Sequence, residues 1–282
     1  MSSRHTPLLS VAAIAIAVGV AGCGGKAKDK AKEQFNEQPV EALYNNAADL
    51  LDKHRWSEAA TAFDEVERQH PYSSWARRSM LMSAYANYQA NKYDDAIKDA
   101  QQFISLHPGN IGAPYAYYLV AICYFEQIMD VGRDQSNTQA ALNALLEVTR
   151  RFPESEYARD ARLKIDMTYD QLAGKEMEIG RFYEARDQHL AAINRFKTVV
   201  EDPNYQKTTH AAEALHRLVE CYLSVGMISE AQKAAAVLGY NYPGSEWYQR
   251  SYALMKTNNV PMPTHAEAKQ KGWLTKTFVG LF

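Results

Sequence analysis

The side chains best suited to chemistry in this sequence are two histidines and two glutamates that lie close together: His210, Glu213, His216 and Glu220. On a helix, the last three would share one face, because residues three and four positions apart are neighbours. A catalytic zinc site needs a tighter set of histidines and an open coordination position. We therefore interpret this group as a solvated or groove-facing helix surface and predict that no metal binds.

The other signatures of enzyme chemistry are missing from the sequence. It has no glycine-rich phosphate loop, no His-Glu-x-x-His motif and no Cys-x-x-Cys pair. An envelope hydrolase on a helical scaffold would need a convergent acid/base or nucleophile group, and we find none. We expect no catalytic residues and no cofactor. The 31 basic and 33 acidic residues nearly balance, so no basic excess indicates a nucleic-acid partner.

One cysteine stands where a covalent modification is expected. Cys23 follows an uncharged run, residues 8–21, and ends the sequence VAGC. A basic start, a short apolar stretch and a small-residue exit are typical of a secretory signal, and the stretch is too short to span a membrane well. VAGC resembles a lipobox, which predicts cleavage of residues 1–22 and a lipid on Cys23. Gly24, in place of an aspartate, favours the outer membrane; the alternative is an ordinary signal peptide with an incidental cysteine.

The two remaining cysteines and the residues after Cys23 are interpreted more simply. Residues 23–38 are the lipidated cysteine and a polar, charge-mixed stretch that cannot bury enough apolar surface to fold, so we predict a flexible linker. Cys123 and Cys221 could form a disulfide in an oxidising compartment. Both lie within apolar helical patterns, and we favour two buried free thiols.

A repeated spacing indicates the elements that position these side chains. An alanine precedes a proline by twelve residues in five places, at Ala59, Ala96, Ala141, Ala191 and Ala231. The segments between have apolar positions at helical spacing, although the apolar register of the fourth is one residue off. Ala47 and Ala84 stand a further twelve residues upstream of the first two alanines, so paired small residues would let two helices cross closely.

These features resemble the tetratricopeptide repeat. The intervals between successive prolines are 37, 45, 50 and 40 residues, longer than the usual repeat of about 34. We predict an all-α fold in which residues 39–256 form a tetratricopeptide-like helical-hairpin solenoid of about five repeats with a concave groove. A long first helix over about residues 157–186 is expected in the fourth repeat, and residues 257–282 are expected to be a C-terminal tail.

Three groups of residues are candidates for partner binding. Tyr85, Tyr88 and Tyr115 belong to tyrosine-rich first helices of repeats two and three, where some phenols could line the groove because tyrosine combines apolar area with a polar tip. Arg133 and Asp134 lie in an insertion, MDVGRDQSN, in the third repeat, and loops often carry function. Trp273 and Phe278 belong to an apolar stretch, GWLTKTFVGLF, whose alternatives are docking on the last repeat, on a partner or at the membrane interface.

Local sequence is more specific than the repeat alone. The stretches PYAYYLVAICYF, GRDQ, RRFPESEYARDA and KEMEIGRFYEARDQHLAAINRF resemble the BamD (ComL) family of outer-membrane lipoproteins over roughly residues 39–250. That resemblance implies a scaffold of the β-barrel assembly machinery, lipid-anchored at the periplasmic face of the outer membrane.

The same resemblance implies three kinds of partner. The first is a BamA-like β-barrel assembly protein, bound mainly by the C-terminal repeats. The others are further Bam lipoproteins and nascent outer-membrane proteins, whose C-terminal aromatic-containing strand is recognised by the N-terminal repeats. The alternative is a tetratricopeptide lipoprotein that coordinates cell-wall or division proteins.

Overall fold

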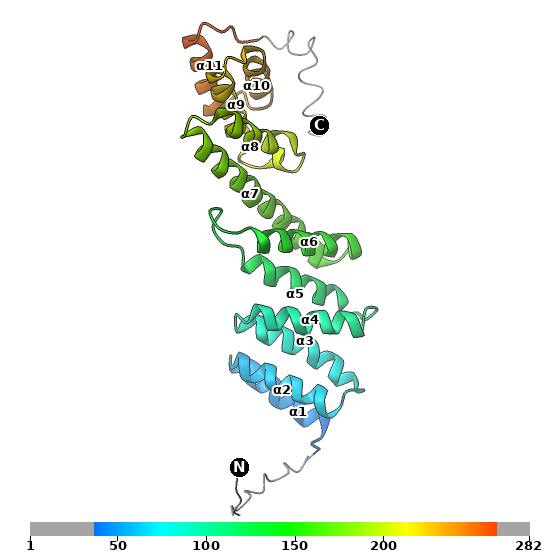
Figure 1. Ribbon diagram of the computed structural model, residues 1–282. Coiled ribbons are helices and arrows are strands. Elements are labelled where there is room, and N and C mark those ends of the chain that lie inside the picture. The colour runs from blue at the N-terminus through cyan, green and yellow to red at the C-terminus, as the bar shows by residue number, and fades with distance from the viewer. Residues whose placement is uncertain (1–36, 264–282) are drawn as a thin grey trace, which may run out of the picture. The chain divides into compact units, whose positions relative to one another are not determined.

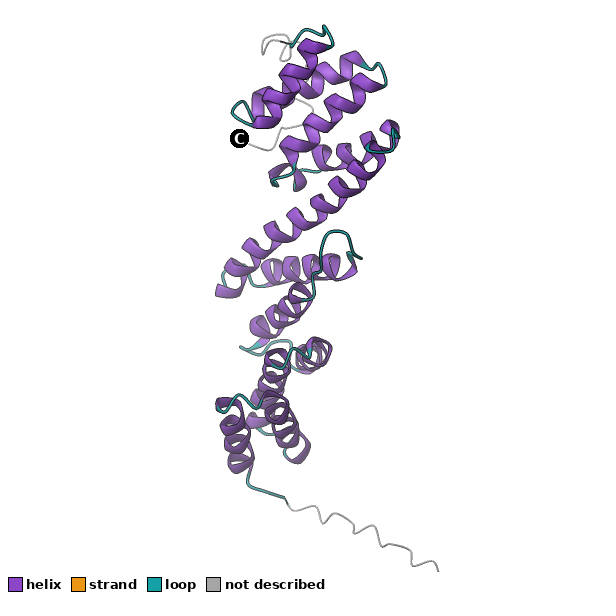
Figure 2. Cartoon of the chain, turned by 90° about the vertical axis from the view of Figure 1, so that its left-hand side faces the viewer, coloured by secondary structure: helices purple, strands orange, loops and turns teal. Residues whose placement is uncertain are grey.

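A computed structural model describes residues 37–263, and this part of the chain contains helices and loops but no strand (Figure 2). Ten of its helices form five hairpins, and their bounds are α1 (Val40–Asp52) with α2 (Trp56–Gln69), α3 (Ser74–Gln89) with α4 (Tyr93–Leu106), α5 (Ala113–Glu126) with α6 (Ser136–Arg151), α7 (Glu156–Glu184) with α8 (His189–Glu201), and α9 (Ala211–Ser224) with α10 (Ile228–Asn241). A 3-10 helix, η1 (Tyr205–Lys207), precedes α9, and a further helix, α11 (Glu246–Thr257), follows α10.

Each helix packs on the next along the chain, so the five hairpins stack in sequence order (Figure 1). The first helices also contact one another, α1 with α3, α3 with α5, and α5 with α7, while α9 contacts α11. A surface is therefore built from residues of successive first helices. The all-α, tetratricopeptide-like fold is confirmed, including the long first helix of the fourth repeat, α7.

The stacking alanines explain why the hairpins close tightly. Ala59, Ala96, Ala141 and Ala231 are fully buried. In the fourth repeat the fully buried residue is Ala192 and not Ala191, in keeping with the shifted register of that segment. Twelve residues before Ala192 stands Gly180, and the ring of Phe196 lies so close to it that a Cβ there would overlap the ring. A small residue on the first helix is therefore needed where a large one of the second helix crosses it.

Four of the five hairpins use the same turn between their helices. His54, Asn91, Asp187 and Gly226 have φ between +56° and +76°, the left-handed conformation that ends many helices. In the second repeat, the N–H of Lys92 donates to the carbonyl of Asn87 (2.9 Å) and the N–H of Asn91 to that of Tyr88 (2.9 Å). These two bonds form a Schellman motif. The third repeat has the insertion in place of this turn.

α11 is an element that the alanine–proline spacing did not predict. Ser245 Oγ accepts a hydrogen bond from the N–H of Tyr248 (3.2 Å), just as Ser73 and Ser155 cap α3 and α7. Asn259 then takes the same left-handed turn as the first helices of four repeats. α11 is thus built as the first helix of a sixth, incomplete repeat. The Pro-x-Ser sequence at residues 243–245, shared with 71–73 and 153–155, is the signal that could have found it.

Both described cysteines are free and buried, as predicted. Cys123 lies on α5 in the core shared by the second and third hairpins, and Cys221 lies on α9 in the core of the C-terminal hairpins. Burial raises the pKa of each thiol to about 12, so neither is reactive at neutral pH. Cys23, Trp273 and Phe278 lie outside the described residues.

Candidate interaction surfaces

Tyrosines of three successive first helices lie together on one surface. Tyr88 and Tyr115 pack over the core that contains Cys123, and Tyr85 is close enough to interact electrostatically with both. Tyr157, at the start of α7, lies 5.7 Å from the ring of Tyr115 and 5.2 Å from that of Tyr118. We name these five residues of α3, α5 and α7 the tyrosine face.

The phenols of the tyrosine face are half-buried and held in place by packing. Burial raises the pKa of Tyr88, Tyr115, Tyr118 and Tyr157 above the ordinary value, so their hydroxyls stay protonated and can donate hydrogen bonds. The Tyr118 hydroxyl already donates to Asp160 of α7. Partly exposed rings with few rotatable bonds offer a partner both apolar area and hydrogen bonds at a low cost in entropy.

Only part of the tyrosine face was predicted from the sequence. Tyr85, Tyr88 and Tyr115 were candidates and the structure brings them together, whereas Tyr118 and Tyr157 were missed as site residues. Tyr157 was predicted to begin the long first helix of repeat four, but not to contact the tyrosines of repeat three. Its contact with α5 depends on the α5–α7 packing, which no spacing along one helix reveals.

The insertion of the third repeat is an ordered loop held by its own polar groups. Asp130 organises it, since its carboxylate accepts the N–H of Gly132 (2.8 Å) and its carbonyl accepts the N–H of Arg133 (2.9 Å). Gln135 Nε2 donates to the carbonyl of Arg133 (3.1 Å). Both Arg133 and Asp134 are exposed. Within residues 37–263 no ion pair or hydrogen bond engages the Arg133 guanidinium, whereas the Asp134 carboxylate accepts the hydroxyl of Ser136 (2.5 Å).

A second polar surface joins the end of α7 to α9. Arg217 of α9 lies 3.4 Å from Glu184, 3.4 Å from Glu213 and 3.0 Å from Glu220. Arg181 of α7 contacts the same Glu213 oxygen at 3.1 Å. We name Arg181, Glu184, Glu213, Arg217 and Glu220 the arginine network.

The side chains of the arginine network are more buried than those of an ordinary surface ion pair. The side chains of Glu184, Glu213 and Arg217 are only 16%, 15% and 26% exposed. Burial raises the pKa of Glu184, and the Arg217 guanidinium opposes that shift. The thiol of Cys221 also donates to Glu184 (3.6 Å). Each carboxylate is thus partly withdrawn from water and depends on the guanidinium that faces it.

The histidine of the predicted helix surface is turned inward toward α11. His216 is 4% exposed, its Nδ1 lies 2.8 Å from Ser251 Oγ, and its ring lies 5.4 Å from that of Trp247. Burial lowers its pKa, while Glu220, 3.5 Å from its Nε2, acts in the opposite direction. This histidine therefore helps to hold α11 on α9.

The group His210, Glu213, His216 and Glu220 does not converge on one point. Glu213 and Glu220 bind Arg217, His216 binds Ser251, and His210 lies 3.5 Å from Asp170 of α7. Residues 37–263 hold no group of three histidine, cysteine, aspartate or glutamate side chains arranged to bind a metal.

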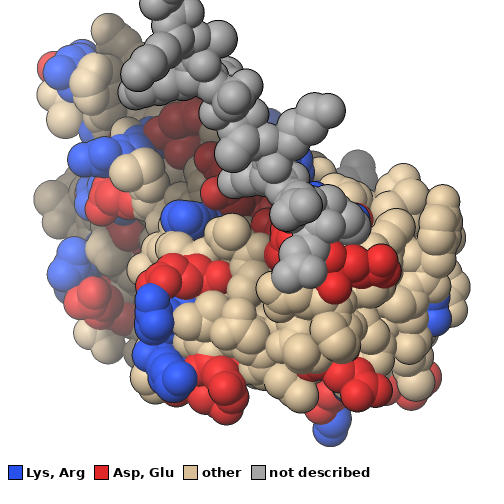
Figure 3. Space-filling model, turned by 90° about the horizontal axis from the view of Figure 1, so that it is seen from below, with Lys and Arg blue, Asp and Glu red and all other residues tan. Residues whose placement is uncertain are grey.

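The surface charges are mixed. Viewed from the end where α1 and α2 lie, basic and acidic side chains are interspersed on the left, and mostly acidic ones border the uncharged area on the right (Figure 3). None of the helices described is long and apolar enough to cross a bilayer.

Known proteins are similar to this chain over most of its length. Residues 36–238 match the family model YfiO, an outer membrane lipoprotein. The chain is 57% identical over 254 residues to the outer membrane protein assembly factor BamD of Caulobacter vibrioides, covering 90% of this chain and 82% of that protein. It is 44% identical over 255 residues to BamD of Rickettsia prowazekii, covering 90% of this chain and 98% of that protein. Among solved structures, the match to a tetratricopeptide protein of Thermus thermophilus covers 77% of this chain and 100% of that chain, with 17% identity and a TM-score of 0.37.

Proposed function

Since the chain belongs to the YfiO/BamD family of outer membrane protein assembly factors, we propose that it works as a two-surface scaffold without chemistry of its own. In this proposal the tyrosine face receives the C-terminal, aromatic-containing strand of a nascent outer-membrane protein. The C-terminal repeats, α7 to α11, bind a BamA-like β-barrel assembly protein, and other Bam lipoproteins join the complex. The names of the relatives favour assembly over the coordination of cell-wall or division proteins.

The observation that carries the proposal is the tyrosine face itself. Its rings come from three consecutive first helices and lie side by side at half burial. An extended segment with alternating apolar residues would place its aromatic side chains against these rings and its backbone groups against the phenol hydroxyls. Aromatic pairs of this kind contribute about 0.5–1.5 kcal/mol beyond the area that they bury.

The test uses the full mature chain and a peptide copied from the last strand of an outer-membrane barrel protein. Tyr115→Ala should weaken peptide binding about tenfold, as expected for an aromatic residue at the centre of an interface. Tyr72→Ala is the matched control, because Tyr72 lies in the loop after α2 and is 97% exposed. Equal affinity of the two variants, each with an unchanged helical circular dichroism spectrum, would refute the role of the tyrosine face.

The insertion supplies a second candidate contact. Arg133 presents a cation on a loop whose shape is fixed by Asp130 and Gln135, so a partner's carboxylate could bind it without reordering the loop. We expect Arg133→Glu to reduce co-purification with the BamA-like partner in mild detergent, and Asp134→Lys to test the neighbouring charge. Arg78→Glu, at an exposed position of α3, is the control. Retention of the partner by Arg133→Glu would make the insertion a surface loop only.

The location rests on Cys23. A lipid on this residue would hold the chain at the periplasmic face of the outer membrane, since several acyl chains anchor a protein stably. We expect the intact mass of the membrane-derived protein to show Cys23 as the first residue with its acyl groups. Cys23→Ser should give an uncleaved or released form, and an unmodified Cys23 in the membrane fraction would contradict the anchor. Purification with cell-wall enzymes in place of a β-barrel protein would instead support the alternative function.

A further inference from the structure

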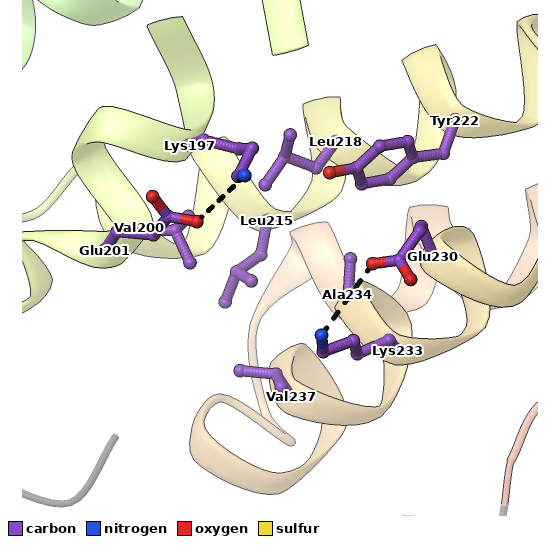
Figure 4. A pocket seen from close by; sticks show the side chains of 10 residues that line it. All are labelled: Lys197, Val200, Glu201, Leu215, Leu218, Tyr222, Glu230, Lys233, Ala234 and Val237. Carbon is purple, nitrogen blue, oxygen red and sulfur yellow. Dashed lines mark ion pairs between the residues drawn. The ribbon is translucent and has the colours of Figure 1, made fainter. Parts of the chain in front are cut away.

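A small apolar groove lies on the C-terminal hairpins, away from the surfaces described above (Figure 4). Its floor is the α9 stripe of Leu215, Leu218 and Tyr222, and its walls are Val200 of α8 with Ala234 and Val237 of α10. The free volume is about 110 Å³. A cavity of about 150 Å³ lined by apolar side chains accommodates benzene, so this smaller groove takes at most one aromatic ring or one leucine side chain.

The charges at the rim are paired within their own helices. Lys197 lies 3.1 Å from Glu201 on α8, and Lys233 lies 3.8 Å from Glu230 on α10 (Figure 4). With these four charges paired along their helices, the groove presents an apolar floor bordered by a polar rim. The groove therefore favours an apolar side chain as its occupant over a charged ligand or a metal.

The described chain ends against α10, on a different face of this helix from the groove. After α11, Val260 is buried in the C-terminal core, and the carbonyl of Pro261 accepts a hydrogen bond from Gln232 Nε2 of α10 (3.0 Å). Gln232 is the residue next to Lys233 of the rim. The chain is therefore fixed against α10 just before it continues into residues 264–282.

We propose that residues 272–282 of this same chain occupy the groove. From the end of the described chain to Gly272 there are nine residues, which span about 14 Å as a helix and about 30 Å when extended. The full width of α10 is only about 10 Å, so the segment can reach the other side of this helix. Its length and starting point thus allow an intramolecular contact.

The composition of the segment matches the groove. It holds Trp273, Leu274, Phe278, Leu281 and Phe282, with Lys276 as its only charge. Spacings of three to five residues would place these side chains on one face of a helix. In the proposal Phe278 enters the groove and its neighbours cover the exposed edges of α8 and α10. The segment then covers the side of the last complete hairpin at the groove of α8, α9 and α10, whereas α11 covers its end.

Disulfide trapping in the full mature chain tests the contact. Ala234→Cys places a thiol at the groove wall and Phe278→Cys places one in the segment. The buried Cys123 and Cys221 remain unreactive because burial raises each thiol pKa to about 12. Mild oxidation at low protein concentration should link positions 234 and 278 within one chain, as read by peptide mapping. The matched control pair is Thr149→Cys with Phe278→Cys, because Thr149 is a partly exposed residue of α6.

Links that form between two chains, or links no more frequent than in the control pair, would overturn the proposal. A second measurement covers the case in which the cysteines alter packing. Truncation after Pro263 should lower the thermal midpoint by about 4 °C. In an Ala234→Arg variant, the arginine side chain fills the groove. Truncation of this variant should lower the thermal midpoint little further, because both changes remove the same contact. Additive effects, or a truncation without effect, would place the segment elsewhere, on a partner or at the membrane.

Discussion

The tyrosine face and the arginine network are built on the same series of first helices, yet they use opposite chemistry. On α3, α5 and the start of α7, partly exposed phenols pack over an apolar core and remain able to receive another group. On the end of α7 and on α9, charges satisfy one another, with Arg217 contacting three carboxylates. The comparison suggests that the first surface is suited to binding an incoming chain and the second to holding the helices together.

This difference has an energetic origin. A tyrosine that loses its partner can still be hydrated through its hydroxyl, so a vacant tyrosine face costs little. A half-buried carboxylate that loses its guanidinium keeps its desolvation penalty without compensation. Substitutions on the two surfaces should therefore separate binding from stability, which the following experiments can confirm or contradict.

The largest expected effect is on the arginine network. Arg217→Met keeps much of the side chain's length but leaves the partly buried Glu184 without its cation and Glu213 with Arg181 alone. We expect the free energy of unfolding, measured with urea, to fall by about 2 kcal/mol, below the 3–5 kcal/mol of a fully buried pair. Arg150→Met is the control, because its ion pair with Glu147 lies on the surface and should contribute less than about 1 kcal/mol. Similar losses in both variants would remove the distinction.

A smaller effect should appear with pH at the same end of the molecule. Burial holds the pKa of His216 below its ordinary value, despite the opposing charges of Glu220 and Glu213 and in concert with Arg217 and Arg250. The unfolded chain therefore takes up a proton below about pH 6.5 that the folded chain binds only at lower pH, so stability falls as the pH drops. Between pH 7.5 and 5.5 the wild type should lose about 1 kcal/mol more than His216→Asn. Parallel losses would contradict this role for His216.

On the tyrosine face a comparable deletion should be mild. Tyr118→Phe removes the hydroxyl that donates to Asp160, but this carboxylate is 42% exposed, can be hydrated and lies 3.3 Å from Lys164. We expect a loss of less than about 1 kcal/mol in the urea experiment. A loss as large as that of Arg217→Met would show that the tyrosine face is structural, and would weaken the proposed binding role.

The smallest expected effect is a change in the alkylation rate of the two buried thiols, one of which lies beneath each surface. Neither Cys123 nor Cys221 should be alkylated in the native chain at pH 8, since the thiol pKa is about 12 in each case. Tyr115→Ala should speed alkylation of Cys123 alone, and Arg217→Met that of Cys221 alone, because each change loosens only the packing around its own thiol. Mass spectrometry of the alkylated peptides distinguishes the sites. Joint acceleration of both thiols by either variant would mean that the two regions open as one unit.

Much of the helical framework could be predicted from spacing, because it depends on contacts within one hairpin. The alanine–proline interval placed Ala59, Ala96, Ala141 and Ala231 at buried crossings, and the apolar patterns around Cys123 and Cys221 indicated buried thiols. The fourth interval was off by one residue, since Gly180 and Phe196 set the crossing there around Ala192.

The polar contacts between hairpins could not be predicted in the same way. Helical spacing groups Glu213, Arg217 and Glu220 on one face of α9, but only the length and crossing of α7 bring Arg181 and Glu184 to them. Likewise, α11 turned His216 from an expected surface residue into a buried one. Such pairings depend on where separate helices meet, which the period of a single helix does not encode.

One helix spans the distance between the two surfaces. α7 carries Tyr157 in its first turn and Glu184 at its end, and an α-helix rises about 1.5 Å per residue, so these residues lie about 40 Å apart along its axis. Charges in physiological salt are screened beyond about 8 Å. Ligands seated at opposite ends of α7 could therefore not sense each other electrostatically. The length of α7 fixes the distance between the two ligands, and only a tilt or bend of this helix would transmit a mechanical signal from one ligand to the other.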